Sequence, residues 1–300
     1  MIKPPGPTFW GGYAGYFADP DGNNTADALY FPNRHMPVRA DLFSRVAWQL
    51  KSRAGVKVNA WLPVLGFELP DPVQRQALAI RSGEADGMHR LDFSNPQARQ
   101  VILDIYEDLA INSYFEGLLF HDDAYLRDTE LPDLPGGDDG AARTRALIDF
   151  TLALRDRAQR WRPKLATVRN LYAEPVLRPQ SAAWFAQRLD LFIQAYDQTA
   201  LMAMPWMEGS RRPERWLDRL LAAVRAHDPQ LRHTLFELQT VDWRSGQPIP
   251  GERLRAQIRR LQAQGVHHFA WYPDDFIADQ PSTHDARAAM SAGSFPYPEK

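Results

Sequence analysis

The hydrophobic positions of this chain form short apolar runs that alternate with longer segments of helical periodicity. Short apolar runs bounded by glycine or polar residues are typical of buried strands, and repeats at three and four residues are typical of helices. The pattern predicts strands at Tyr13–Ala18, Lys57–Leu65, Gly117–His121, Leu165–Asn170, Leu189–Tyr196, His233–Leu238 and His267–Tyr272. It predicts helices at Asp41–Arg53, Pro96–Asn112, Ala141–Arg160, Ser181–Arg188, Pro213–Ala226 and Pro250–Gln264.

The order of these elements indicates the fold class. Alternation of strand and helix is typical of βα units around a parallel sheet. About seven evenly spaced strands, without the glycine-rich turn of a nucleotide site, favour an α/β fold of the (β/α) TIM-like barrel type. No internal repeat or low-complexity linker divides the chain, so we expect one domain over residues 1–300. Ser94 is expected to cap the helix that starts at Pro96, and Gly55 and Gly265 to end helices.

Composition narrows the classes of function. With 44% hydrophobic residues the chain can bury a large core, and no apolar run is long enough to span a bilayer. A formal net charge of −2 gives no electrostatic reason to bind nucleic acid or an anionic membrane. The absence of cysteine excludes disulfides, thiolate metal sites and a cysteine nucleophile. The first residues, Met1-Ile-Lys-Pro-Pro-Gly-Pro, lack the apolar core of a signal peptide, so none is expected in this sequence.

The segment Gly117-Leu-Leu-Phe-His-Asp-Asp-Ala-Tyr-Leu-Arg-Asp128 is the strongest candidate for chemistry. His121, Asp122 and Asp123 follow the end of a predicted strand. Crowded carboxylates raise one another's pKa, so packing alone gives no reason to place them together. Catalytic residues of barrel enzymes lie at the carboxyl ends of strands. We interpret the cluster as a site; the structural alternative is that Asp122 or Asp123 only caps the next helix.

The same segment carries a family resemblance. Phe120-His-Asp-Asp-Ala124, followed by Asp128, resembles the C-terminal glycoside-hydrolase domain of PgaB-type proteins, which are two-domain de-N-acetylases of the biofilm polysaccharide poly-β-1,6-N-acetyl-D-glucosamine. Further similar segments follow the family's order along the chain: Phe17–Gly22, Tyr30–Arg34, Pro37–Phe43, Arg169–Tyr172, Ala203–Trp206 and Ala270–Pro273.

The resemblance implies a barrel that acts as an endo-glycoside hydrolase on the partially de-N-acetylated polymer, with no cofactor. It also implies a periplasmic or outer-membrane-associated location and an upstream deacetylase domain in the full-length family, so that this chain corresponds to part of a longer exported protein or to a truncated relative. In the family another strand and helix precede the segment at Phe17. We therefore expect the barrel to be incomplete or irregular at its N-terminus.

Glycoside hydrolysis generally uses two carboxyl groups. Asp122 is the first candidate, because it follows the strand end and matches the aspartate on which the family's hydrolase activity depends. Adjacent side chains near a strand end point to opposite faces, so one of Asp122 and Asp123 is expected to face the cleft and the other to brace the loop. His121 is expected to orient an aspartate by a hydrogen bond.

The second carboxyl group stays open between Asp123, Asp128 and Glu237. Glu237 is equally consistent with a structural pair to Arg169. A substrate-assisted mechanism, in which the acetamide of the sugar attacks, is also open, because an aspartate pair would serve to orient it.

Other residues are candidates for binding the polymer. Asp128 is interpreted as a partner for glucosamine ammonium groups, which the resemblance supports at Asp122 and Asp128, or else as a solvated loop residue. Aromatic rings suit the apolar faces of sugars. Four aromatic residues are expected at the barrel mouth: Trp206, Trp271, Tyr272 and Tyr196. Trp61 fits either the lining or the core, and Arg34 either holds a carboxylate in the groove or anchors its own loop.

A metal site is the alternative chemistry. Histidines and nearby aspartates can bind zinc, and the chain offers His35, His89, His121, His267 and His268. No pair has the His-x-x-x-His spacing of a helix, and the adjacent pair diverges on a strand, so we expect no metal. Two hypotheses remain: a hydrolase of the partially deacetylated polymer, and a non-catalytic module that holds this polymer during export.

Overall fold

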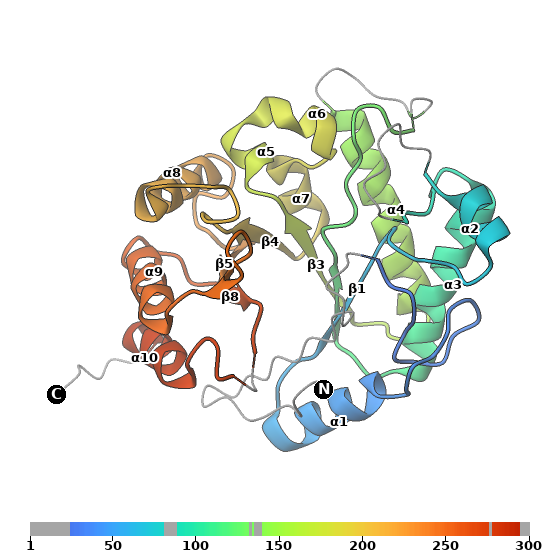
Figure 1. Cartoon of the computed structure of the whole chain (residues 1–300), viewed down its shortest axis with the longest axis horizontal. Helices are drawn as coiled ribbons and strands as arrows, with labels where there is room; N and C mark the ends of the chain where they lie inside the picture. Colours follow the sequence, from blue (N-terminus) through green and yellow to red (C-terminus); the bar gives the residue numbers. More distant parts are fainter. Residues whose placement is uncertain (1–24, 81–88, 132–133, 135–139, 276–277, 295–300) are drawn as a thin grey trace.

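The computed structural model describes residues 25–80, 89–131, 134, 140–275 and 278–294. A parallel sheet lies at its centre and curls so that helices surround it (Figure 1). In sheet order its strands are β1 (Asn59–Leu62), β2 (Gly117–Phe120), β3 (Ala166–Leu171), β4 (Gln198–Ala203), β5 (Thr234–Gln239) and β8 (Phe269–Tyr272). A curled parallel sheet with external helices is a TIM-like (β/α) barrel architecture, which confirms the predicted fold class.

The remaining elements connect and cover these strands. The helices are α1 (Phe43–Ala54), α2 (Pro72–Leu78), α3 (Pro96–Asn112), α4 (Ala141–Gln159), α5 (Glu174–Leu177), α6 (Ala182–Phe185), α7 (Leu189–Ala195), α8 (Pro213–Arg225), α9 (Gly251–Ala263) and α10 (Thr283–Ser294), with a 3₁₀ turn η1 (Pro179–Ser181). A short antiparallel hairpin of β6 (Val241–Asp242) and β7 (Gln247–Pro248) follows β5. Helix α3 packs on α4, and α9 packs on α10.

Most predicted elements are confirmed with small shifts at their ends. The predicted strand Tyr13–Ala18 lies outside the described residues. The predicted helix Ser181–Arg188 is wrong in extent: only η1 and α6 form there, and α6 ends at Ala186, whose φ of 49° is left-handed.

The predicted strand Leu189–Tyr196 is wrong, because this segment forms α7. Leu189, Phe192 and Tyr196 are buried at a spacing of three and four residues, which places them on one helix face. The strand begins instead at Gln198. Five consecutive buried residues end β4, so no alternation distinguishes this strand from a buried helix.

The predicted cap at Ser94 is also wrong by one residue. The side chain of Asn95 accepts hydrogen bonds from the backbone nitrogens of Gln97 and Ala98, and Ser94 bonds to Asp92 instead. The two glycine helix ends are confirmed. Gly55 and Gly265 have φ values of 66° and 81°, a left-handed conformation that glycine adopts without steric cost.

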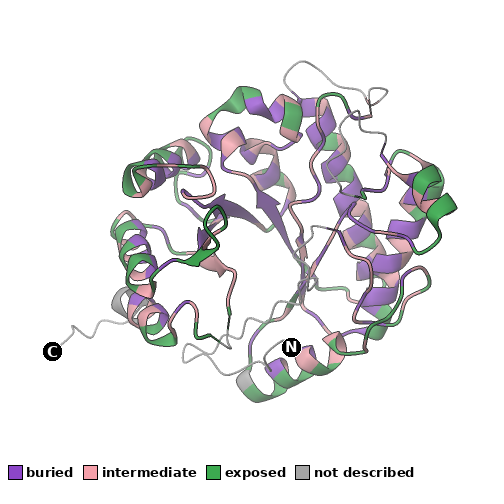
Figure 2. Cartoon of the chain, viewed as in Figure 1, coloured by how far each residue is buried: buried purple, intermediate pink, exposed green. Residues whose placement is uncertain are grey.

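The strand register divides the sheet into two faces. Neighbouring strands align residues of one face, and the next residue of each strand lies on the other. The outer face, which packs against the helices, carries Leu62, Phe120, Arg169, Leu201, Phe236, Leu238 and Trp271. The inner face carries Trp61, Leu119, Asn170, Met202, Glu237 and Tyr272. Figure 2 shows the central strands as largely buried. The inner face is therefore the polar and aromatic one.

The loop after β2 is fixed to the end of β1 by Asp123. Its side chain is fully buried. The carboxylate accepts hydrogen bonds from the backbone nitrogens of Val64, Leu65 and Gly66 at 2.6 to 3.0 Å. These backbone groups follow β1, so one side chain satisfies three donors and joins two adjacent strand ends.

Arg169 holds the same loop from the outer face of β3. It is the largest fully buried side chain among the described residues. Its guanidinium donates to the carbonyl oxygens of His121 and Ala124 and lies 5.4 Å from the centre of the Phe192 ring. The loop is thus anchored on both sides before any ligand is considered.

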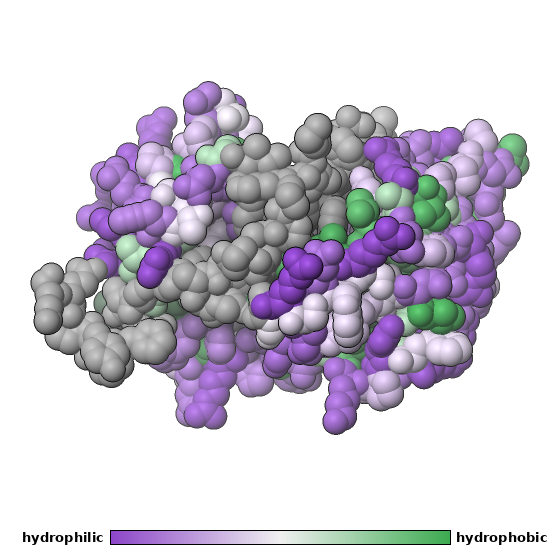
Figure 3. Space-filling view, turned by 90° about the horizontal axis from the view of Figure 1, so that it is seen from below, coloured by the Kyte–Doolittle hydropathy of each residue, from purple (hydrophilic) through white to green (hydrophobic). Residues whose placement is uncertain are grey.

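The surface is mostly hydrophilic. The face shown in Figure 3 carries charged and polar side chains with small, separate apolar spots. Large exposed apolar residues among those described are Val38, Leu42, Trp48, Val73, Ile111, Trp161, Trp184 and Trp243. None of the helices in the described part of the chain combines the length and apolarity that a membrane crossing needs.

We predict that Asp123→Ala lowers the free energy of unfolding by about 3 kcal/mol, because three buried backbone donors lose a charged acceptor. Asp71→Ala is the matched control. Asp71 caps α2 by accepting from Val73 in an exposed position, and its loss should cost about 1 kcal/mol. Denaturant unfolding measures both. Equal losses would contradict the bracing role of Asp123.

Candidate active site

The candidate site lies at the carboxyl ends of the strands and centres on Asp122. Its side chain is 14% exposed. The Tyr172 hydroxyl, from the end of β3, donates to Asp122 Oδ2 at 2.9 Å. The His121 Nδ1 lies 2.8 Å from Asp122 Oδ1 and 3.4 Å from Asp123 Oδ1. Asp122 therefore has one oxygen held by a phenol and the other by an imidazole.

The imidazole of His121 is protonated. Its Nδ1 is also 3.2 Å from the backbone nitrogen of Asp123, but one ring nitrogen cannot accept there and donate to Asp122 as well. Burial alone would lower the pKa of His121. The neighbouring carboxylates of Asp122 and Asp123 outweigh it and raise that pKa to about 10. We therefore assign Nδ1 as the donor to Asp122, which is the shorter contact.

Asp122 is ionised. Burial raises its pKa, but the charge of His121 and the hydrogen bonds from His121 and Tyr172 together hold the pKa below its usual value. The pKa of the Tyr172 phenol shifts in the opposite direction. Burial and the adjacent carboxylate raise it well above its usual value. Tyr172 thus remains a hydrogen-bond donor.

Glu237 is the second carboxyl group of the site. It lies on the inner face of β5 and is 7% exposed. Asn170 on β3 donates its amide nitrogen to Glu237 Oε2 at 2.9 Å. Burial, and then the negative charge of Asp122, raise the pKa of Glu237 to about 8. At neutral pH Glu237 is therefore protonated while Asp122 is ionised, a separation typical of an acid and its partner.

The side chain of Asp123, unlike that of Asp122, is not exposed to solvent. Its carboxylate is fully buried and occupied by the backbone nitrogens after β1. One of the adjacent aspartates braces the loop, as expected: it is Asp123, whereas Asp122 keeps some exposure to solvent. The candidate catalytic assignment of Asp123 is wrong, because no oxygen of it can reach a ligand.

Aromatic rings line the same side of the sheet. The Trp61 ring is 4.6 Å from the His121 ring and meets Tyr272 edge-on at 5.2 Å. Trp243, from the β6–β7 hairpin, stacks on Tyr272 at 6.2 Å and is 42% exposed. Tyr272 also senses the site, because burial and the charges of Asp122 and Glu237 raise its pKa. Trp61 is therefore a lining residue, and Tyr272 lies where it was predicted.

The two other predicted tryptophans separate. Trp206 lies in the turn that follows β4, half-buried, at the predicted edge of the sheet. Trp271 is not beside Tyr272 in the groove. It aligns with Leu238 on the outer face, packs against the core, and its indole nitrogen contacts Asp274 at 3.3 Å. Consecutive strand residues face opposite sides, so Trp271 and Tyr272 cannot both line the mouth.

Tyr196 and Arg34 are also corrected. Tyr196 ends α7 before β4 begins, is buried, and shares a hydrogen bond with Thr151 at 2.6 Å. It is a core residue at the amino end of β4. Arg34 anchors its own loop to α3. Its backbone and side chain donate to Asp108, and its guanidinium to Glu107.

Asp128 is exposed in the loop after β2. Its negative charge acts on the buried Arg143 of α4. Burial lowers the pKa of Arg143, and the charges of Glu130 and Asp128 oppose this by raising it. Glu130, in contrast, is fully buried and pairs with Arg90. Among the described residues of this loop, Asp128 thus has an exposed carboxylate and Glu130 a buried one.

Three residues of the site were missed by sequence reasoning: Tyr172, Asn170 and Trp243. Asn170 and Tyr172 end the third strand, so the rule that pointed to Asp122 applied to them as well. Trp243 lies in the turn between the two-residue strands β6 and β7, where no periodicity reveals it. Within the described residues no group of three histidine, aspartate or glutamate side chains is arranged to hold a metal ion.

The sequence of this chain matches a family model and a known protein. The model of hypothetical glycosyl hydrolase family 13 matches residues 11–133 and 140–272. The poly-beta-1,6-N-acetyl-D-glucosamine N-deacetylase of Escherichia coli (strain K12) is 36% identical over 95% of this chain. This chain spans 47% of that relative, about half its length.

Two solved structures resemble this chain in fold. The PgaB (BpsB) glycoside hydrolase domain of Bordetella bronchiseptica is 43% identical, with a TM-score of 0.85 over 91% of this chain and 86% of that one. A β-galactosidase from Rahnella sp. R3, 12% identical with a TM-score of 0.56 over 85% of this chain and 47% of that one, shares the fold. The resemblance to PgaB-type glycoside hydrolase domains is confirmed, and the chain belongs to hypothetical glycosyl hydrolase family 13.

Proposed function

We propose that this chain is an endo-acting glycoside hydrolase that cleaves partially de-N-acetylated poly-β-1,6-N-acetyl-D-glucosamine. The observation that carries the proposal is the pair of carboxyl groups with opposite protonation, Asp122 ionised and Glu237 protonated. Cleavage of a glycosidic bond needs a proton for the leaving oxygen and negative charge beside the cationic sugar. The two groups meet these needs at neutral pH.

In the proposed reaction Glu237 donates its proton to the glycosidic oxygen as the bond to the anomeric carbon breaks. Asp122 stabilises the positive charge that develops on the sugar, either directly or by orienting the substrate acetamide that attacks the anomeric carbon. Water then completes hydrolysis and returns a proton to Glu237. The contacts of Asp122 with His121 and Tyr172 keep its carboxylate ionised and oriented throughout.

Two features support the proposed substrate. The exposed carboxylate of Asp128 suits a glucosamine ammonium group. Trp61, Tyr272 and Trp243 form a row of aromatic rings suited to the apolar faces of sugars.

The name of a relative points to the same polymer. This relative is called a deacetylase of poly-β-1,6-N-acetyl-D-glucosamine, and this chain covers about half of it. We therefore propose that the upstream deacetylase domain of the family and a periplasmic location apply to the full-length protein. Deacetylation by such a domain would produce the ammonium groups that the acidic site recognises.

We predict that Asp122→Asn reduces release of oligosaccharides from the partially deacetylated polymer by about 10²- to 10⁴-fold, because it removes the ionised carboxylate. Circular dichroism checks the fold. Asp156→Asn is the matched control on α4, where the side chain is 62% exposed, and should keep full activity. A folded wild-type protein that binds the polymer but releases nothing would favour the non-catalytic binding module.

We predict that kcat/KM falls as the pH rises through about 8, because Glu237 must be protonated to act and its raised pKa keeps the proton up to that point. Glu237→Gln should lower kcat by about 10²-fold or more and abolish this alkaline limb. The measurement is a pH profile of both proteins. An unchanged limb in the residual activity of the variant would reject Glu237 as the acid.

We predict that Tyr172→Phe moves the acid limb of the pH profile to higher pH, because the pKa of Asp122 rises when it loses the phenol hydrogen bond. Tyr196→Phe is the matched control, since Tyr196 is a buried tyrosine bonded to Thr151. Its acid limb should not move. A shift of equal size in both variants would indicate a general loss of packing.

A further inference from the structure

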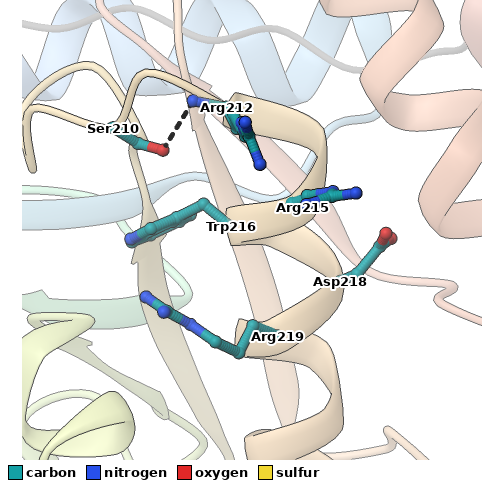
Figure 4. Close-up of a pocket in the computed structure, with 6 residues that line it drawn as sticks. All are labelled: Ser210, Arg212, Arg215, Trp216, Asp218 and Arg219. Carbon is teal, nitrogen blue, oxygen red and sulfur yellow. Dashed lines mark hydrogen bonds between the residues drawn. The ribbon is translucent and has the colours of Figure 1, made fainter.

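A cavity lies away from the candidate active site, on the outer side of α8. It has a volume of about 590 Å³ and is lined by Ser210, Arg212, Arg215, Trp216, Asp218 and Arg219 (Figure 4). Trp216 is 7% exposed and forms an apolar wall that is continuous with the core. The cavity is therefore built on a rigid element of the helical layer.

The lining is strongly basic, because its single carboxylate is already neutralised. Asp218 accepts hydrogen bonds from Arg260 of α9 at Oδ1 and Oδ2, and Gln264 donates to the same Oδ1 at 3.1 Å. Those three hydrogen bonds come from α9 and the residue that follows it. The charge of Asp218 is thus directed toward α9 and not toward the arginines of α8.

Three guanidinium groups remain without an acceptor. Throughout the described ranges, no hydrogen bond or ion pair engages the side chains of Arg212, Arg215 or Arg219, whereas many other arginines are paired, such as Arg188 with Asp190. The three side chains are exposed. Three unpaired guanidinium groups make this face positive, and a positive face attracts anions.

The spacing of the arginines indicates the shape of the ligand. Arg212 directly precedes α8, and Arg215 and Arg219 follow at spacings of three and four residues, within the first two turns of the helix. In Figure 4 they do not converge on a point: Arg215 projects to one side of the helix and Arg219 to the other. A single small anion cannot engage all three. A row of separated negative charges can.

We propose that this face, defined as Arg212, Arg215, Trp216 and Arg219, binds an acidic segment of a partner protein. Carboxylates spaced along a peptide match a row of guanidinium forks, and each contact is charge-assisted. An apolar side chain of the segment would pack on Trp216. The site cannot serve the proposed substrate, because deacetylated glucosamine carries the same sign of charge as the arginines.

The face is independent of the hydrolase. Its residues lie on α8 and the preceding loop, on the outer ring of helices, and none belongs to the candidate active site around Asp122 and Glu237. Binding there would dock the domain to its partner while leaving the carboxyl ends of the strands open to polymer. Loss of hydrolysis and loss of docking can therefore be told apart.

The test is fluorescence anisotropy of a labelled poly-glutamate peptide with the whole chain. The variant is the triple substitution Arg212→Gln, Arg215→Gln and Arg219→Gln. A matched control removes three other exposed arginines, which lie on α1 and at the end of α4: Arg45→Gln, Arg53→Gln and Arg160→Gln. Both variants change the net charge equally. We expect the first to weaken peptide binding about tenfold or more and the control to leave it within about twofold.

Each other outcome overturns the proposal. Absence of peptide binding by the wild-type chain would remove the docking function, and an equal loss in both triple variants would reduce it to net charge. Binding of a single-stranded oligonucleotide, or of inorganic phosphate, as tightly as the peptide would assign the face to another class of anion. Hydrolysis of the polymer should be unchanged in both variants, so failure of the hydrolase proposal leaves this result readable.

Discussion

The site depends on one buried carboxylate. Asp123 satisfies three backbone nitrogens beyond β1 while its own chain continues from β2, so the relative position of two strand ends is set by a side chain. Arg169 closes the loop from the other side through two carbonyl oxygens. Asp122 and His121 are held between these anchors. The fold therefore sets the positions of Asp122 and His121 before any ligand binds. Electrostatic preorganisation requires such fixed positions.

The protonation pattern follows from the same arrangement. Burial would neutralise each titratable group alone, but His121 has two carboxylates beside it and becomes cationic, and that cation in turn keeps Asp122 ionised. The charge of His121 and the amide of Asn170 also act on Glu237 and lower its pKa, but burial and the charge of Asp122 outweigh them, so Glu237 keeps its proton. Two carboxyl groups of similar intrinsic acidity thus acquire different roles from their neighbours alone.

Local patterns predicted the strand end that carries the candidate site better than they predicted the elements around it. The run from Gly117 to Asp128 identified the strand end and Asp122, because the signal lies within a few residues. Tyr196 was misplaced because β4 is buried on both sides and reads like the helix before it. The partner of Asn170 is Glu237, 67 residues away, and the contacts of Arg34 are more than 70 residues away. Pairings of that separation are created by the fold, and no periodicity encodes them.

Counting charges around the proposed reaction gives a consequence of the His121 contacts. Asp122 and Asp123 contribute two negative charges, His121 and Arg169 two positive ones, and protonated Glu237 none, so the resting centre is electrically neutral. When Glu237 transfers its proton to the leaving oxygen, Glu237 becomes negative and the centre acquires a net negative charge. The sugar becomes cationic in the same step. Attraction that exists only along the reaction coordinate accelerates chemistry without tightening the ground-state complex. In the proposed reaction the centre therefore attracts the sugar most strongly while the glycosidic bond is breaking.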